Sequence, residues 1–186
     1  MTSSNQAQRN SLQKQTTPAA MLSRFGVLIA FAIMLIFLSF ATKTFLTPKN
    51  LINVVRQVSV NGIIAVGMML VLLTGGIDLS VGSVVALSGV VAASFAQGGN
   101  YPVIVPILMG LLVGVLVGVV NGFLIVKVRI VPFIATMGML SMARGVALVY
   151  SNGRPISNLS DAFRFIGSGS LMDALPVISL IMLACF

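Results

Sequence analysis

Thr74-Gly-Gly-Ile-Asp-Leu-Ser80 is a polar, glycine-rich break between two long apolar segments. The segment before it, Val58–Leu73, is almost entirely apolar, and the segment after it, Val81–Ala96, is small and apolar. Asp78, inside the break, is the only carboxylate in the first 160 residues. A carboxylate beside unwound backbone is costly in hydrocarbon, and it is tolerated where it is buried in protein or lines a water-filled cavity. The break is therefore the first place to look for function.

The composition is typical of an integral membrane protein. Of the 186 residues, 58% are hydrophobic and 8% are charged, whereas a soluble domain carries about 25% charged residues. The chain has eleven Lys and Arg against three Asp. These basic residues lie between the apolar runs, as topology signals and lipid-headgroup contacts do. Because no basic stripe with interleaved aromatic residues occurs, we predict no nucleic-acid binding.

Side chains for catalysis or metal binding are scarce in this sequence. Histidine is absent, and Cys185 is the single cysteine. Neither a Ser-His-Asp nor a Cys-His arrangement can be built, nor can a His/Cys metal cluster. We therefore predict no enzyme activity, no catalytic or metal-binding residue and no cofactor bound by this chain.

Hydropathy predicts an all-α, polytopic membrane helical bundle with five complete spans and a truncated sixth. Residues 1–20 are predicted to be a disordered polar tail, residues 21–186 a partial transmembrane domain, residues 51–57 an interfacial lead-in and residues 151–174 a polar loop. The expected complete spans are Phe25–Ala41, Val58–Leu73, Val81–Ala96, Val103–Val126 and Val131–Tyr150. The last apolar segment, Leu175–Phe186, would be about 18 Å long as a helix and too short to cross. We therefore expect the chain to be a fragment or a truncated protein.

The Lys and Arg counts do not settle the orientation in the membrane. If every predicted span crosses the membrane, five basic residues fall on each side. The positive-inside rule therefore favours neither orientation. We favour a cytoplasmic N-terminus, because the long polar tail then need not be translocated.

Small and polar residues inside the spans are further candidates. Glycines recur at every fourth position of the fourth span, at Gly110, Gly114, Gly118 and Gly122. This spacing favours close helix packing over a smooth face that slides during gating. Asn61 and Asn121 are amides within spans that either bond to a neighbouring helix or line a pathway. Arg144 either reaches the interface or has a gating or pairing role, with Asp78 as a conceivable partner.

The break itself allows two compatible interpretations. In the first it is a surface turn in which Asp78 caps the next helix, with Ser80 as the competing cap. In the second it separates a discontinuous helix pair whose backbone and hydroxyl groups line a solute path. The candidate residues of such a path or break are Asn61, Thr74, Gly75, Gly76, Asp78, Ser80 and Gly82.

The sequence around the break resembles a known family. Residues 60–83 strongly resemble the permease subunits of ribose-type bacterial ABC importers. Their sequence is Val-Asn-Gly-Ile-Ile-Ala-Val-Gly-Met-Met-Leu-Val-Leu-Leu-Thr-Gly-Gly-Ile-Asp-Leu-Ser-Val-Gly-Ser. Shorter matches in the same order are Phe45–Leu51, Val131–Thr136, Arg144-Gly145 and Tyr150–Gly153. The resemblance covers about residues 45–156.

The resemblance implies a multi-pass permease of the bacterial cytoplasmic (inner) membrane that imports ribose or a similar monosaccharide. It also implies three partners, which are a second permease subunit that we expect to be a second copy, a cytoplasmic ABC ATPase and an extracytoplasmic sugar-binding protein. The sequence has no G-x-x-x-x-G-K-[ST] motif, so ATP is expected on the partner ATPase. Family members continue through several more spans, and we expect these residues alone not to support uptake.

Two alternative functions stay open at this point. One is a secondary, ion-coupled transporter in which Asp78 is a coupling-ion ligand or proton carrier. The other is a non-transporting membrane scaffold. A neighbouring gene for an ABC ATPase and another for a secreted sugar-binding protein would favour the importer.

Overall fold

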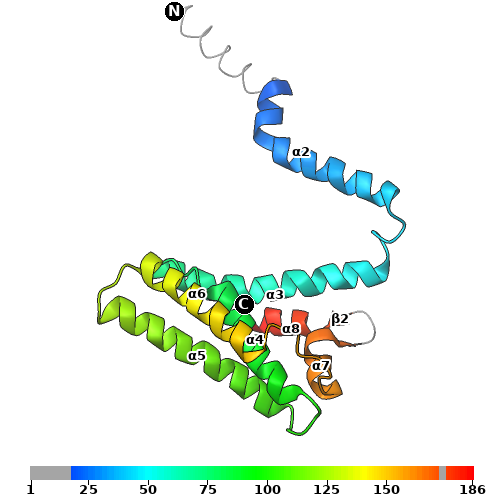
Figure 1. Ribbon diagram of the computed structural model, residues 1–186. Helices are drawn as coiled ribbons and strands as arrows, with labels where there is room; N and C mark the ends of the chain where they lie inside the picture. Colours follow the sequence, from blue (N-terminus) through cyan, green and yellow to red (C-terminus); the bar gives the residue numbers. More distant parts are fainter. Residues whose placement is uncertain (1–17, 172–174) are drawn as a thin grey trace, which may run out of the picture. The chain divides into compact units, whose positions relative to one another are not determined.

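The computed structural model describes residues 18–171 and 175–186, and this part of the chain is helical apart from one short hairpin (Figure 1). The helices in chain order are α2 (Pro18–Ala41), α3 (Pro48–Leu73), α4 (Val81–Ala96), α5 (Ile104–Val126), α6 (Pro132–Tyr150), α7 (Asp161–Ser168) and α8 (Val177–Cys185). The strands β1 (Ser170–Leu171) and β2 (Leu175–Pro176) pair antiparallel. The predicted polar tail falls outside the described residues, except for its last three residues, which begin α2.

The described helices are consistent with a membrane helical bundle, but they do not establish five spans. Three helices are long and apolar enough to cross a membrane, namely Pro48–Leu73, Ile104–Val126 and Pro132–Tyr150. Phe25–Ala41 and Val81–Ala96 are apolar but shorter. The count of five therefore stays a prediction.

Two local predictions need correction. Residues 51–57 do not form a separate lead-in, because they lie within the continuous helix α3. The predicted polar loop contains α7, whose Ala162, Phe163, Phe165 and Ile166 give an eight-residue helix an apolar side. Short amphipathic helices of this kind are hidden by the polar residues around them.

Thr47 and Pro48 determine where α3 begins. The Thr47 hydroxyl oxygen accepts a hydrogen bond from the Asn50 N–H at 3.4 Å. Proline at the first helical position loses no hydrogen bond, because an N–H group there would have no partner within the helix, and its fixed φ suits the helix. The Asn50 side chain also donates to the Phe45 carbonyl at 2.8 Å. The stretch Phe45–Asn50 is thus a hydrogen-bonded turn that leads into the helix.

The chain divides into two units, Met1–Leu51 and Ile52–Phe186, and the second contains the bundle described below. Within it α4 packs against both α5 and α6 (Figure 1). Leu87 of α4 and the alanines 143 and 147 of α6 are buried together, with valines of α4 and α5 packed around them. Small side chains on α6 allow this close approach.

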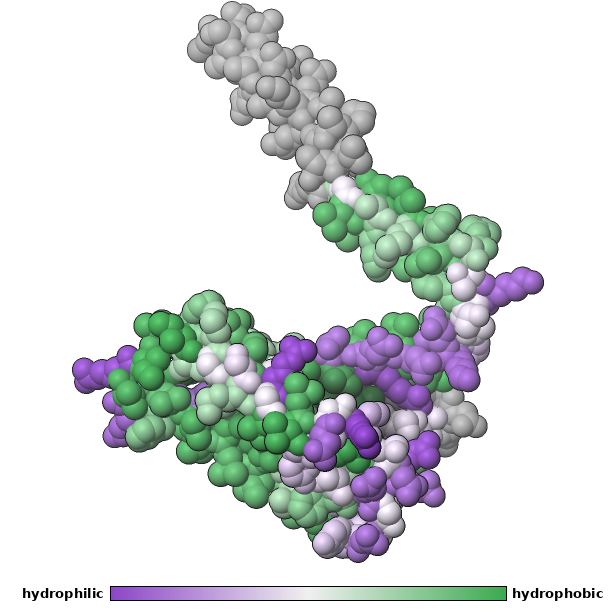
Figure 2. Space-filling view, viewed as in Figure 1, coloured by the Kyte–Doolittle hydropathy of each residue, from purple (hydrophilic) through white to green (hydrophobic). Residues whose placement is uncertain are grey.

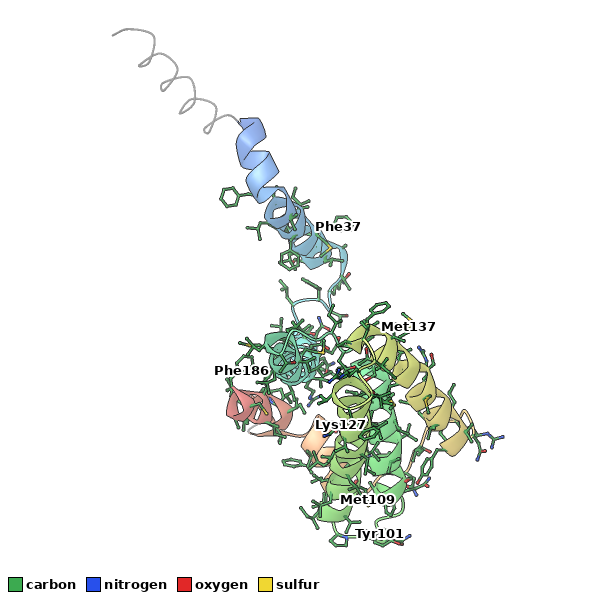
Figure 3. The ribbon with its side chains drawn as sticks, turned by 90° about the vertical axis from the view of Figure 1, so that its left-hand side faces the viewer. Phe37, Tyr101, Met109, Lys127, Met137 and Phe186 are labelled. Atoms are coloured by element: carbon green, nitrogen blue, oxygen red, sulfur yellow. The ribbon has the colours of Figure 1, made fainter. Side chains whose placement is uncertain are left out.

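The bundle of α4, α5 and α6 has two distinct ends. At one end Tyr101 lies in the α4–α5 turn, and at the other Met137 lies in the first turns of α6 (Figure 3). At the Tyr101 end the Ser94 and Tyr150 hydroxyls are 2.8 Å apart. There the Gly98 N–H also donates to the carbonyl of residue 158 at 3.0 Å. The α4–α5 turn and the segment after α6 therefore meet at one end, and the Thr74–Ser80 break lies at the other.

The outer surface of the bundle is strongly apolar. Figure 2 shows hydrophobic residues over much of the helices, with hydrophilic residues at the left-hand edge, where Figure 1 places the α5–α6 connection, and at the lower right, where it places α7. On α5, Leu111, Val115 and Val119 are each more than 60% exposed. Continuous apolar surface of this kind requires lipid or a protein partner to cover it.

The glycines of α5 differ in what surrounds them. A Cβ atom on Gly110 would lie 3.2 Å from the Ala92 Cβ and 3.4 Å from the Ser88 carbonyl oxygen. A Cβ on Gly114 would make only an ordinary contact with Ser88, at 3.8 Å, and those on Gly118 and Gly122 would meet nothing within 4 Å. Of these four glycines, Gly110 therefore makes the close contact with α4.

We predict that Gly110→Val destabilises the bundle, whereas the matched control Gly118→Val does not. Both variants introduce the same residue into α5, so the change in helix propensity is the same. At position 110 the new side chain must displace α4, which costs about 1–3 kcal/mol. Thermal unfolding of the purified protein in detergent measures the difference, and equal midpoints for the two variants would contradict it.

Candidate functional site

The break begins because Gly75 terminates α3. Gly75 has a φ of +76°, a conformation that glycine adopts without steric cost. Its N–H donates to the Leu72 carbonyl at 3.0 Å, and the Gly76 N–H donates to the Val71 carbonyl at 3.3 Å. These two bonds are a Schellman motif, which satisfies the last carbonyls of a helix and turns the chain away. The Gly-Gly pair is therefore the local reason that α3 stops.

Asp78 organises the entry into α4. Its Oδ1 accepts one hydrogen bond from the Ser80 N–H at 2.7 Å and another from the Ser80 hydroxyl at 2.6 Å. Ser80 is fully buried, and the Val84 N–H donates to its carbonyl at 2.9 Å to begin the helix. The Ser80 side chain makes no capping bond to α4. The Asp78 carboxylate thus forms an Asx turn with the residue before the helix rather than bonding to the amides of the first turn.

One hydrogen bond from α5 and one from α6 hold the break in place. The Asn121 side-chain amide donates to the Ser80 hydroxyl oxygen at 3.1 Å. The Thr136 hydroxyl lies 3.2 Å from the Ile77 carbonyl oxygen and 2.8 Å from the Pro132 carbonyl oxygen, both as acceptors. Asn121 is 6% exposed and Thr136 is 2% exposed. Two neighbouring helices therefore fix the unwound segment in one conformation.

A cavity of about 460 Å³ lies beside the break. The break, the end of α5 and the start of α6 each contribute to its walls. The lining residues are Val71, Thr74, Gly75, Gly76, Ile77, Asp78, Gly118, Asn121, Gly122, Ile125, Val126, Pro132 and Thr136.

The residues singled out from the sequence fall into two groups. Those that line the cavity are Thr74, Gly75, Gly76, Asp78, Gly118 and Gly122. Those that do not line it are Asn61, Ser80, Gly82, Gly110, Gly114 and Arg144. Ser80 is nevertheless part of the site, because it joins Asp78 to Asn121. Arg144 is exposed on α6 and, within the described part of the chain, forms no ion pair with Asp78.

Thr136 was not among the residues singled out from the sequence. Asn121 was noted there as an amide that either bonds to a neighbouring helix or lines a pathway. Both are polar residues within apolar helices, and both lie within two turns of the helix end nearest the break. This position, a polar residue in an apolar helix close to the break, was the feature of the sequence that could have indicated both residues. Among the described residues, no group of three His, Cys, Asp or Glu side chains comes together as a metal site.

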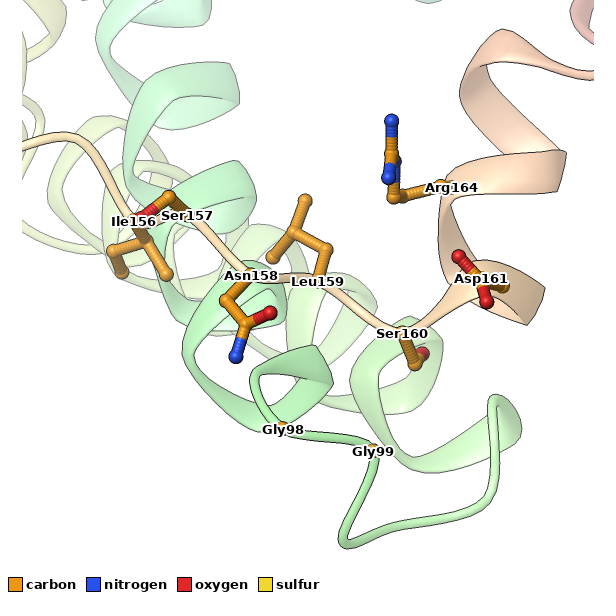
Figure 4. A pocket seen from close by; sticks show the side chains of 9 residues that line it. All are labelled: Gly98, Gly99, Ile156, Ser157, Asn158, Leu159, Ser160, Asp161 and Arg164. Carbon is orange, nitrogen blue, oxygen red and sulfur yellow. The ribbon is translucent and has the colours of Figure 1, made fainter.

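A second cavity, of about 590 Å³, lies at the other end of the bundle (Figure 4). It is lined by the α4–α5 turn, the segment leading to α7 and two charged residues of α7, Asp161 and Arg164. The Gln97 side-chain amide donates to the Ser157 carbonyl at 3.1 Å beside it. This polar loop cluster is separate from the break.

These features are those of a membrane transport permease, and the chain belongs to that class. Residues 50–185 match the family described as the permease component of branched-chain amino acid transport systems, and the chain is a member of this family.

The individual relatives that it resembles are sugar permeases. It is 42% identical to the ribose import permease protein of Bacillus subtilis (strain 168) over 176 residues, which is 94% of this chain and 54% of the relative. It is 43% identical to the ribose import permease protein of Escherichia coli (strain K12) over 146 residues, 76% of this chain and 45% of the relative. It is also 39% identical to the L-arabinose ABC transporter permease protein of Azospirillum brasilense over 152 residues, 82% of this chain and 44% of the relative.

The resemblance predicted from the residues around the break is thereby confirmed. The chain spans about half the length of these curated relatives. No solved structure matches it.

We predict that Gly75→Ala destabilises the protein and that the matched control Gly76→Ala does not. At Gly75 the positive φ makes any Cβ unfavourable by about 1–2 kcal/mol, although the space around it is open. At Gly76 a Cβ would make only ordinary contacts, at 3.7–3.8 Å. Thermal unfolding in detergent distinguishes the two variants, and an unchanged midpoint for Gly75→Ala would show that the break does not depend on this conformation.

Proposed function

We propose that this protein is the membrane-spanning permease of an ATP-driven importer for ribose or a similar monosaccharide. The observation that carries the proposal is the cavity beside the Thr74–Ser80 break, whose walls come from three helices. Unwound backbone at membrane depth is tolerated where it lines a cavity, and transporters place their solute sites at such breaks. The names of the relatives, which are ribose and arabinose permeases, support a sugar as the solute.

The chemistry of the cavity suits a neutral, hydroxylated solute. Thr74 and Asn121 supply uncharged hydrogen-bonding groups, and Val71 and Ile125 supply apolar wall. Asp78 is the charged residue of this lining, and its Oδ1 is bonded to Ser80. A neutral solute of this kind does not carry the large desolvation cost of an ion. The absence of tryptophan from the whole sequence argues against a tight aromatic sugar site. Weak affinity in the permease, with selectivity supplied by a separate binding protein, fits this lining.

The surroundings of Asp78 argue against the alternative of a secondary, ion-coupled transporter. Its Oδ1 already accepts two hydrogen bonds from Ser80. A coupling-ion ligand or proton carrier needs carboxylate oxygens that can exchange partners during the cycle. Asp78 therefore fits better as a structural organiser of the path.

The proposed mechanism is alternating access in a complex. A cytoplasmic ABC ATPase would hydrolyse ATP, an extracytoplasmic sugar-binding protein would deliver the solute, and two permease subunits, expected to be identical copies, would rock against each other. The exposed apolar face of α5, with Leu111, Val115 and Val119, supports burial against lipid or a second subunit. No step of ATP hydrolysis is assigned to this chain.

We also infer five complete spans with a cytoplasmic N-terminus in the bacterial cell membrane. The backbone bonds between the α4–α5 turn and the segment after α6 support a common side of the membrane for these two connections. With the N-terminus inside, that side is the extracytoplasmic one. The α5–α6 connection, with Lys127 and Arg129, would then be cytoplasmic.

The transport proposal predicts ATP-dependent sugar uptake. A full-length version of the permease, reconstituted in proteoliposomes with its ATPase and binding protein, should accumulate radiolabelled D-ribose only when ATP is supplied. A catalytically inactive ATPase is the matched control and should abolish accumulation. Uptake that needs an ion gradient instead of ATP would favour the secondary transporter, and no uptake of ribose, arabinose, xylose or allose would favour the scaffold.

The topology proposal predicts which introduced cysteines react from outside the cell. In a Cys185→Ser background, Asn100→Cys and Ser157→Cys should react with a membrane-impermeant maleimide in intact cells. Lys127→Cys should react only after the membrane is permeabilised. If only one of positions 100 and 157 were labelled in intact cells, the fold would be contradicted. If position 127 were labelled in intact cells and positions 100 and 157 only after permeabilisation, only the orientation would be contradicted.

A further inference from the structure

The starting point is a buried polar atom at the break cavity. Asn121 is 6% exposed and lines the cavity. Its Oδ1 is buried and, within the described part of the chain, has no hydrogen-bond partner. An unpaired buried acceptor costs about 1–3 kcal/mol, and such atoms in a folded protein call for an explanation. The donor for this oxygen is therefore a water molecule, a further segment of protein or a solute in the cavity.

The orientation of the Asn121 amide follows from the groups that it contacts. The Ser80 hydroxyl gives its single proton to the Asp78 Oδ1, 2.6 Å away. The Ser80 oxygen can then only accept from Asn121, which must present its NH₂ group at 3.1 Å. A flipped amide would place two acceptors together and lose this bond. The carboxylate thus determines, through Ser80, which atom of Asn121 remains unpaired.

The wall beside Asn121 leaves room for a solute. Gly122 follows it directly, and Gly118 lies three residues earlier, on the same side of α5. Both line the cavity, and a Cβ at either position would meet nothing within 4 Å. Side chains at these two positions would instead occupy part of the cavity.

We propose that Asn121 is a solute-recognising residue whose Oδ1 accepts a hydrogen bond from one hydroxyl of the transported sugar, and that Asp78 and Ser80 are positioning residues that keep this oxygen available. This inference rests on the proposed transport function and adds to it a specific contact. It assigns Asp78 a role that requires no contact with the solute. Small movements of α5 against the break would bring Oδ1 to the cavity surface during the transport cycle.

The test compares sugars that lack single hydroxyl groups. ATP-dependent uptake of D-ribose and of its 2-deoxy, 3-deoxy and 5-deoxy analogues is measured in the reconstituted full-length transporter, with wild-type permease and with Asn121→Ala. For one analogue, the ratio of ribose uptake to analogue uptake should be roughly 5–10-fold lower in Asn121→Ala than in the wild type, because in the wild type that analogue leaves the amide oxygen unpaired. The same binding protein is used with the wild type and with Asn121→Ala. Its own selectivity therefore cancels when the ribose-to-analogue uptake ratio of one permease is divided by that of the other.

Further variants separate recognition from structure. Asp78→Ala and Ser80→Ala should lose the same discrimination as Asn121→Ala. Asp78→Asn, which keeps an acceptor oxygen for Ser80, should retain it. Asn61→Ala removes an exposed amide that does not line the cavity and serves as the matched control with unchanged discrimination. If Asn121→Ala does not assemble, Asn121→Ser supplies the measurement.

The outcomes distinguish the two levels of the proposal. Equal loss of ribose and of every deoxy analogue in Asn121→Ala would overturn the inference, because a purely structural amide affects all solutes alike. The importer function would stand in that case, since wild-type uptake of ribose tests it independently. Absence of ATP-dependent ribose uptake by the wild type would remove the importer function, and the assigned contact with it.

Discussion

The two hydrogen bonds from Ser80 to the Asp78 carboxylate, at 2.6 and 2.7 Å, are the contact on which the break depends. They begin α4 without a side-chain cap and leave the Ser80 oxygen free to accept from Asn121 on α5. Thr136 on α6 holds the neighbouring Ile77 carbonyl. One carboxylate thereby keeps a non-helical segment in register with two neighbouring helices. Its charge is compensated by nearby donors rather than by a basic partner, which suits a site of low polarity.

The cavity follows from this arrangement and from an uneven use of glycine along α5. Gly110 brings α5 into contact with α4, whereas Gly118 and Gly122 leave space beside the break. Glycines with the same four-residue spacing therefore allow helix packing at one end of α5 and leave space for the cavity at the other. Periodicity alone cannot separate these uses, because the difference depends on what the neighbouring helices place opposite each glycine.

Much of the fold could be predicted from hydropathy, since long apolar runs and Gly/Pro punctuation are local signals. The expected segment Val81–Ala96 matches α4 at both ends, and Tyr150 ends α6 as predicted. The helix α7 was missed because its apolar side spans only two turns. The break was located from its composition, but the bonds from Asn121 and Thr136 cross 41 and 59 residues of chain. One sequence carries no direct signal for such long-range pairs.

The short length of α4 has a consequence for the bilayer. At 1.5 Å per residue, its 16 residues extend about 24 Å, less than the roughly 30 Å of a hydrocarbon core. If α4 crosses the membrane as proposed, the break and the α4–α5 turn therefore cannot both sit at the surfaces of an undistorted bilayer. Either the lipid thins around this helix or polar backbone and water reach below the headgroups, as hydrophobic mismatch requires. In both cases the hydrocarbon layer is thinner beside α4 than around a helix of full membrane length.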